Sequence, residues 1–332
     1  MSPKLFTMAL CLRFAQVLSA ENLHDTERDV QSALRRHFVA HMRIAAADRL
    51  IEQPDEIAAY IGARFNTVVL YDTEDSSGFL KSEARIAYEV EFARAHGLHI
   101  LLGKMTEASP AATDDAIRER LTLWAVSGHD VILGVFFLHD DACLIQTTVE
   151  RQRHLYAIAH ETVPDWYVFG MIGGFCYGPP EEEVARYFDP NAFDHLIILM
   201  YPLNGGGLVT SVDPDNEMRR YVVNYVQQMG ERFISRLRPG QFAVLVIQSF
   251  AYYGEPATQM PRAVDIDIQA TAGNAALREI AGQAANRSLA YFLWDGSRGG
   301  MFGLWQRPDW MAAAESANRR SEDPAKAFDR QP

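Results

Sequence analysis

"HDVILGVFFLHDDACL", residues 129–144, carries the clearest structural signal in the chain. The apolar run inside it, residues 131–138, is too short for an amphipathic surface helix and is interrupted by Gly134. Continuous apolar residues over this length are typical of a parallel strand covered on both faces, because such a strand has no polar side. The sequence therefore predicts a buried strand with polar residues at its carboxyl end. Those residues are His139, Asp140 and Asp141.

Similar strands recur along the chain. Between His37 and Trp294, short β-branched or aromatic runs alternate with helical patterns, without a linker. The predicted strands cover residues 37–45, 66–73, 98–105, 131–138, 165–174, 194–202, 242–250 and 288–296. Eight strands alternating with helices over roughly 260 residues predict a single α/β domain, a closed (β/α)8 TIM barrel. A doubly wound sheet is the alternative, but "GGFCYG" and "NGGGL" lack the spacing of a phosphate-binding glycine turn.

The barrel is predicted to span residues 37–310, with an N-terminal extension over 1–36 and a polar tail over 311–332. The first twenty residues form an imperfect secretory leader, because Arg13 interrupts their apolar region. The pattern favours export to the periplasm or the cell exterior. The alternative is a cytoplasmic protein whose extension folds as an amphipathic helix. In an oxidising compartment Cys143 and Cys176 could pair, and two free thiols are the alternative.

Charge and hydropathy exclude several kinds of partner. The formal net charge is −12, from 31 Lys and Arg against 43 Asp and Glu, and no dense basic run occurs. We therefore expect no nucleic acid and no anionic membrane as partners. No apolar stretch reaches the roughly 18 residues that a transmembrane segment needs. The spacing of the three cysteines does not suggest a zinc site, and we expect no metal and no cofactor.

The carboxyl ends of the strands are where a (β/α)8 barrel places its active site. Carboxylates, aromatic rings and amides are prominent among the residues at these ends. Aromatic rings stack on the apolar faces of sugars, and carboxylates and amides bind hydroxyl groups, so this set favours an oligosaccharide or polysaccharide ligand. The predicted mouth residues are His41, Arg43, Tyr71, Asp72, Lys104, His139, Asp140, Asp141, Tyr201, Gln248, Tyr252, Trp294 and Asp295.

Several segments resemble strands of the (β/α)8-barrel glycoside hydrolases. "VILGVFFLHDDA" is similar to their fourth strand, which ends in an acidic dipeptide whose acid protonates the leaving oxygen. "ARFNTVVLYDT", "FDHLIILMYP" and "YFLWDG" resemble their second, sixth and eighth strands, and "HFVAHMRIA" is similar to the first strand of some families. The resemblance implies cleavage of glycosidic bonds. The seventh strand departs from it, because retaining families carry a nucleophilic Glu there and this chain has Gln248.

The resemblance suggests an acid/base mechanism. We hypothesise that Asp141, or its neighbour Asp140, is the general acid, since burial raises the pKa of a carboxyl group at the end of an apolar strand. Asp72 or Asp295 would be the second carboxylate, and Glu255, after the seventh strand, is a further candidate. An amide at position 248 cannot form a glycosyl ester, and a carboxylate separation of about 6.5 to 9.5 Å would suit an inverting mechanism. Each of these acids could instead cap a helix or form a turn.

Other functions stay open. Gln248 favours a carbohydrate-binding barrel that does not hydrolyse its ligand. A lyase or aldolase is a third hypothesis, in which Lys104 would form a Schiff base. A metal site built from His41, Asp72 and Asp141 is disfavoured because the sequence contains no H-x-H pair. A Trp294 buried in the core would give the same sequence signal as one at the mouth.

Overall fold

A computed structural model describes residues 33, 35–46, 51–74, 79–103, 113–137, 147–173, 186–203, 212–254, 260–282, 286–295 and 300–322. The chain divides into two units, Met1–Ala40 and His41–Pro332. In the first unit, residues 35–39 are helical. The second unit contains all the strands described below, so its start lies a little after the predicted boundary at residue 37.

Eight parallel strands form a closed barrel in the second unit, which confirms the predicted (β/α)8 fold. Each strand pairs with its neighbours in chain order, and the last strand closes the ring against the first. The strands are β1 (Arg43–Ala46), β2 (Thr67–Tyr71), β5 (His99–Gly103), β6 (Ile132–Phe136), β7 (Tyr167–Ile172), β8 (His195–Met200), β9 (Ala243–Gln248) and β11 (Leu289–Phe292). Two short antiparallel pairs lie outside the ring: β3 (Thr73–Glu74) with β4 (Phe79–Leu80), and β10 (Ala251–Tyr252) with β12 (Met301–Phe302).

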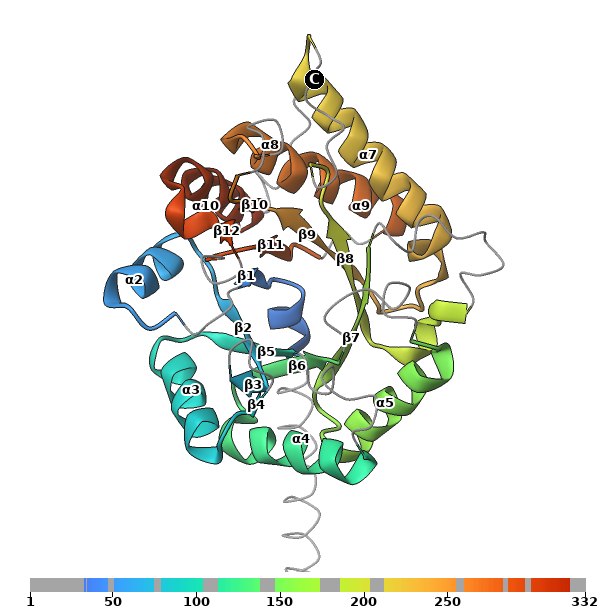
Figure 1. Cartoon of the computed structure of the whole chain (residues 1–332). Coiled ribbons are helices and arrows are strands. Elements are labelled where there is room, and N and C mark those ends of the chain that lie inside the picture. Colours follow the sequence, from blue (N-terminus) through green and yellow to red (C-terminus); the bar gives the residue numbers. More distant parts are fainter. Residues whose placement is uncertain are drawn as a thin grey trace, which may run out of the picture. The chain divides into compact units, whose positions relative to one another are not determined.

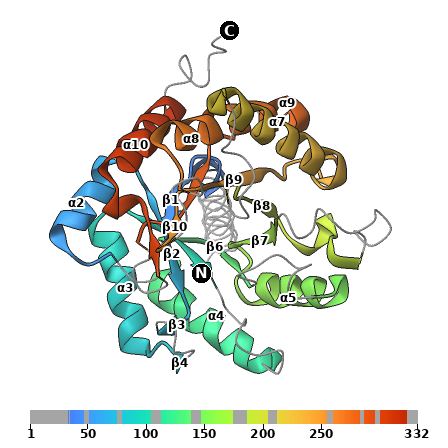
Figure 2. The same ribbon diagram turned by 45° about the horizontal axis from the view of Figure 1, so that its top comes forward.

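Helices surround the strands of this unit (Figure 1). They are α2 (Pro54–Gly62), α3 (Glu83–Ala95), α4 (Asp114–Gly128), α5 (Val149–Thr162), α7 (Pro214–Arg232), α8 (Ala263–Ile268), α9 (Asn274–Ala281) and α10 (Pro308–Glu322). Short helical turns occur at η3 (Pro190–Ala192), η4 (Ile234–Arg236), η6 (Gln269–Gly273) and η8 (Leu304–Gln306). Thr113 is the N-cap of α4, and its side chain accepts a hydrogen bond from the main-chain N–H of Ala116. Figure 2 shows α8 between α10 on one side and the neighbouring helices α7 and α9 on the other, along one part of the ring.

Strand residues alternate between the helix layer and the barrel interior. On β2, Val68 and Leu70 belong to the apolar core beneath the helices, whereas Val69 and Tyr71 face the interior. The side-chain period of two in a strand produces this division. It decides which residues at the strand ends can reach the mouth.

The strand of the opening sequence, β6, contains a β-bulge. Ile100 of β5 pairs with Ile132, but the next residue of β5 pairs with Gly134, so Leu133 is an extra residue. A Cβ atom at Gly134 would lie 2.3 Å from the carbonyl oxygen of Tyr167 on β7, so this close approach requires glycine. The extra residue also shifts the alternation by one position. As a result Phe136 faces the barrel interior.

The seam between β1 and β2 has the sparsest strand pairing of the ring in the described part of the chain. Its register contains the single pair Ile44 and Thr67. Tyr60 of α2 supplements this pairing with its buried hydroxyl, which donates to the carbonyl oxygen of Thr67 (2.6 Å) and accepts from the main-chain N–H of Ala45 (3.1 Å). A helix side chain therefore joins the first two strands where the main chain makes few bonds.

The prediction that residues 37–45 form one strand is wrong at its start. Residues 35–39 are helical and β1 begins at Arg43, where main-chain pairing with the neighbouring strands begins. His41 therefore precedes β1 and Arg43 starts it, so both lie at the opposite end from the mouth. The side chain of Asn66 donates to the carbonyl oxygen of His41 (3.0 Å), and Arg43 Nε donates to that of Arg64 (2.6 Å).

The predicted polar tail is also wrong over residues 311–322, because α10 includes them. Trp310, Ala314 and Ala317 are fully buried at helical spacing. Asn318 donates from its side chain to the carbonyl oxygen of Ala63 (2.8 Å). This helix belongs to the packed helix layer. None of the helices in the described ranges has both the length and the apolar composition that a membrane span requires.

Candidate functional site

A cavity of about 670 Å³ lies in the interior of the barrel unit, and all eight barrel strands contribute to its lining. Most of its wall is aliphatic. The aliphatic lining consists of Met42, Ile44, Ala46, Val69, Leu101, Met171, Ile197, Leu199, Val244, Val246, Ala290 and Met301. These residues continue the period-two pattern of their strands, so the cavity results directly from the alternation described above.

Aromatic side chains surround the carboxyl end of the cavity. Each of them ends a strand or follows one closely. We call this set the aromatic rim: Tyr71, Phe136, Tyr201, Phe250, Tyr252 and Phe292. Ring centroids are 5.1 Å apart for Tyr201 and Phe250, 5.3 Å for Phe250 and Phe292, and 6.4 Å for Tyr71 and Phe136. Tyr71 and Tyr201, which the sequence predicts at the mouth, both lie on the wall of this cavity.

Tyr252 is the most exposed residue of the rim, at 42%. Its strand β10 pairs with β12, and the register joins Tyr252 to Met301, another residue of the cavity wall. Tyr252, which the sequence predicts at the mouth, lies on the wall of the cavity. Its exposed ring offers a ligand a flat, partly apolar surface next to the opening.

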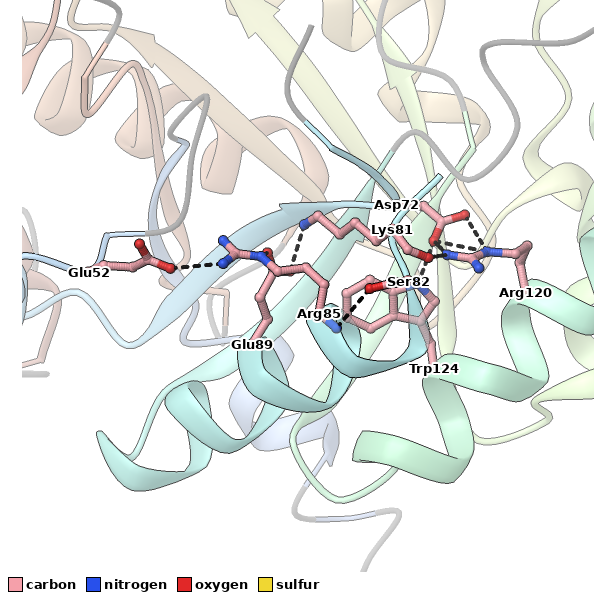
Figure 3. Close-up of polar contacts among 8 residues, drawn as sticks. All are labelled: Glu52, Asp72, Lys81, Ser82, Arg85, Glu89, Arg120 and Trp124. Atoms are coloured by element: carbon pink, nitrogen blue, oxygen red, sulfur yellow. Dashed lines mark hydrogen bonds and ion pairs between the residues drawn. The ribbon is translucent and has the colours of Figure 1, made fainter. Parts of the chain in front are cut away.

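Asp72 follows β2, and its carboxylate points toward Arg120 and Trp124 of α4 (Figure 3). Its side chain is fully buried and accepts hydrogen bonds from Trp124 Nε1 (2.7 Å) and Arg120 Nε (3.0 Å), both on α4. Because Tyr71 faces the interior, the next residue faces the helices. The prediction that Asp72 lies at the mouth is wrong, and Asp72 is not part of the catalytic pair proposed below. The suggested metal site also fails, because His41 lies at the other end of the barrel.

Arg120 also fixes the base of the β3–β4 hairpin. The main-chain N–H of Lys81, just after β4, donates to the carbonyl oxygen of Asp72 (2.8 Å). Arg120 Nη2 in turn donates to the carbonyl oxygen of Lys81 (2.9 Å). The hairpin thus leaves β2 and returns at the same point, and one guanidinium group bonds both sides of its base.

The side chain of Lys81 extends this polar cluster to α3 (Figure 3). Its Nζ lies 2.5 Å from Oε2 of Glu89, a residue that is 1% exposed. Arg85 donates to the other oxygen of Glu89 (2.8 Å) and pairs with Glu52 (3.1 Å). Burial lowers the pKa of the Lys81 ammonium group, and the Glu89 carboxylate partly offsets that effect. The cluster connects the hairpin base to α3, and its residues are absent from the described wall of the cavity.

Gln248 ends β9, as the sequence predicts, but its amide is occupied by main-chain groups. The side chain is buried, its Oε1 accepts from the N–H of Leu203 (2.8 Å), and its Nε2 donates to the carbonyl oxygen of Phe250 (3.4 Å). Its own N–H donates to the side chain of Gln269 (2.9 Å). Gln248 therefore joins the ends of neighbouring strands and is not among the described lining residues.

Two predicted residues follow β11. Trp294 is fully buried, with its ring 4.9 Å from that of Tyr60 and 5.8 Å from that of Trp305. The prediction that Trp294 lines the mouth is wrong, because it packs in the core beneath the helices. Asp295 is 6% exposed and accepts a hydrogen bond from Gln306 Nε2 (2.9 Å). It is not among the described lining residues either.

Several predicted residues lie outside the described part of the chain. The two candidate acids belong to this group, and their roles stay predictions. The full set is Lys104, His139, Asp140, Asp141, Cys143, Cys176 and Glu255.

The sequence prediction missed three aromatic residues of the rim: Phe136, Phe250 and Phe292. It favoured polar residues at the strand ends. For Phe292 the alternation along β11 was an available signal, because Ala290, two residues earlier, also faces the cavity.

The described wall of the cavity contains no charged side chain and no side-chain amide; its polar side-chain groups are tyrosine hydroxyls. Such a surface binds rings and chains by contact rather than by ion pairing. Acid/base chemistry at this mouth would therefore need residues from beyond the described wall.

No protein-family model matches the chain, and no curated protein matches its sequence. Solved structures are similar in fold. An endo-1,4-β-mannanase from Rhizomucor miehei is 10% identical with a TM-score of 0.56, over 85% of this chain and 95% of that one. A GH5_18 protein from Streptomyces cattleya in complex with GlcNAc is 12% identical with a TM-score of 0.56, over 85% and 80%. An endo-β-1,4-mannanase from Thermotoga petrophila is 11% identical with a TM-score of 0.51, over 84% and 76%.

The chain has the fold of (β/α)8-barrel glycoside hydrolases. At these identities the likeness is one of fold, and the same barrel supports many kinds of chemistry. The activity has to be argued from the mouth itself.

Proposed function

We propose that the chain is a carbohydrate-active protein of the glycoside hydrolase kind, which binds an oligosaccharide or polysaccharide at the aromatic rim. The rim is the observation that carries the proposal. Six aromatic residues, each at or just after the end of a different strand, line one cavity, and Tyr252 is 42% exposed there. Sugar rings present apolar C–H faces that stack on such side chains. Similar folds in mannanases make mannan a suitable first substrate to test.

The catalytic part of the proposal assigns the general acid to Asp141, or to Asp140. Support comes from β6, whose last residue, Phe136, belongs to the rim, so the chain leaves this strand at the mouth. The acid would donate its proton to the leaving glycosidic oxygen. A second carboxylate would take a proton from the water that attacks the anomeric carbon, which inverts the configuration. Asp295 and Glu255 are the remaining sequence candidates for that base.

Binding without hydrolysis is the second candidate function. Gln248 favours it, because the seventh strand ends in an amide bonded to main-chain groups rather than in a carboxylate. The described cavity wall also contains no carboxylate. A barrel of this kind would hold a saccharide on the rim and release it unchanged.

The test compares hydrolysis and binding in the full chain. We expect reducing sugar to be released from one of mannan, xylan or cellulose, and Asp141→Asn to lower kcat by about 10² to 10⁴-fold. Asp140→Asn identifies which neighbour is the acid, and Asp115→Asn on the exposed face of α4 is the matched control.

Tyr252→Ala separates the two candidate functions. It should weaken saccharide binding whether or not the ligand is cleaved, by about tenfold for one lost stacking contact. Saturable binding without turnover would select the non-hydrolytic candidate. Full activity in both Asp140→Asn and Asp141→Asn would contradict the catalytic assignment.

A further inference from the structure

The aliphatic part of the cavity extends along the whole height of the barrel. On β1 and the residue before it, Met42, Ile44 and Ala46 all line the cavity. These positions span about 13 Å along the strand, at roughly 3.3 Å per residue. The hollow therefore extends well below the aromatic rim, to a depth that a sugar stacked on the rim would not reach.

Small side chains keep this interior open. Ala46 and Ala290 lie on neighbouring strands and both face the cavity, where bulky branched residues usually fill a (β/α)8 barrel. At Gly103 a Cβ atom would lie 2.3 Å from the Phe136 ring, so the missing side chain lets that ring lie against β5. A larger residue at Ala46 or Ala290 would occupy space that now belongs to the cavity.

The side chains that line the cavity determine which kind of ligand can bind there. A buried water needs about two to four polar partners, and the described wall offers only tyrosine hydroxyls among its side chains. A hydroxyl-rich ligand would lose hydrogen bonds on entering the aliphatic part. A methylene chain loses none, and it gains contact with the aliphatic wall along its length.

We propose that the barrel interior is a binding site for an aliphatic chain about ten carbons long, a length set by the height of the strands. Combined with the proposed function, on which this second step rests, the natural ligand is an alkyl or acyl glycoside. Its sugar would stack on the aromatic rim, and its chain would extend down the barrel along the wall that includes the paired residues Ala290 and Val246.

A series of 1-alkanols tests the chain site without a sugar. Calorimetric titration of the full chain with 1-butanol, 1-hexanol, 1-octanol and 1-decanol should show affinity rising by about fourfold per added methylene group. The increase should stop near ten carbons. No binding, or binding independent of chain length, would overturn the proposal.

A substitution that fills the cavity, compared with the same substitution on the protein surface, tests the proposed site directly. Ala290→Leu should lower the affinity for 1-octanol by at least tenfold without lowering the thermal midpoint, whereas Ala312→Leu on the exposed face of α10 should change neither. Should Ala290→Leu fail to fold, Ala46→Val fills less space and should lower the affinity for 1-octanol by a smaller factor. Unchanged octanol affinity in a folded cavity variant would overturn the proposal.

Different results would contradict the proposed function and the proposed chain site. Alkanol binding together with no response to any saccharide would remove the glycoside and leave the chain site in place. Cleavage of a soluble polysaccharide without alkanol binding would leave the proposed function and overturn the chain site.

Discussion

The carboxylate of Asp72 is buried between β2 and α4, where Arg120 and Trp124 donate hydrogen bonds to it. Arg120 is itself only 15% exposed, so removing its partner's charge would leave a guanidinium group poorly compensated. We expect Asp72→Asn to lower the free energy of unfolding by about 3 to 5 kcal/mol, measured by urea denaturation.

An exposed ion pair provides the control for this substitution. Asp130 pairs with Arg94 and its side chain is 59% exposed, so Asp130→Asn should change stability by less than about 1 kcal/mol. If Asp72→Asn kept wild-type stability but abolished hydrolysis, the structural role assigned to Asp72 would be incorrect.

For individual residues, the sequence predicted which ones lie at strand ends better than it predicted the direction in which their side chains point. Tyr71 and Asp72 are adjacent, and the period of two sends one to the cavity and the other to the helices. The bulge at Leu133 has no sequence signal beyond Gly134, yet it turns Phe136 into the barrel. Side-chain direction depends on the register with neighbouring strands, which a single strand's sequence does not contain.

Among the elements, β1 depends most on side chains for its attachment to β2. The Tyr60 hydroxyl bonds to both strands, and burial raises its pKa, so it remains protonated and able to donate. Tyr60→Phe removes this hydroxyl and leaves the carbonyl oxygen of Thr67 without that donor. We expect a loss of about 1 to 3 kcal/mol in the free energy of unfolding.

Denaturation and amide hydrogen exchange together test this role of Tyr60. In Tyr60→Phe the Ala45 amide should exchange faster than in the wild type, because its acceptor is gone. Tyr88→Phe on α3, where the side chain is 49% exposed, is the control and should change neither quantity. If the Ala45 amide exchanged at the same rate in Tyr60→Phe and Tyr88→Phe, the proposal that the Tyr60 hydroxyl joins β1 to β2 would be contradicted.

The sequence predicted the barrel strands well because their apolar runs reflect burial on both faces, which β6 and β9 show along their whole lengths. It predicted the first strand and the last helix poorly. Residues 37–39 have β-like composition but lie in a helix, and α10 packs through Trp310 and small alanines that resemble a polar tail in sequence. Short or small-residue elements depend on their packing partners, and these are known only from the whole fold.

For the whole molecule, the repetition of strand and helix along the chain is what made the fold predictable. Eight βα units predict closure from their number and spacing, so the barrel could be predicted although individual strand limits were imprecise. The cavity could not be predicted, because it depends on small residues of β1 and β11, two strands that lie side by side only because the barrel closes.

That hollow makes the molecule sensitive to hydrostatic pressure. Unfolding eliminates internal void, so a cavity inside the barrel adds to the decrease in volume on unfolding. We expect high-pressure fluorescence to give a smaller unfolding volume change for Ala290→Leu, which fills part of the cavity, than for the wild type. Equal volume changes in the two proteins would contradict this expectation. Pressure would then unfold this barrel under conditions in which the same barrel with a filled interior persists.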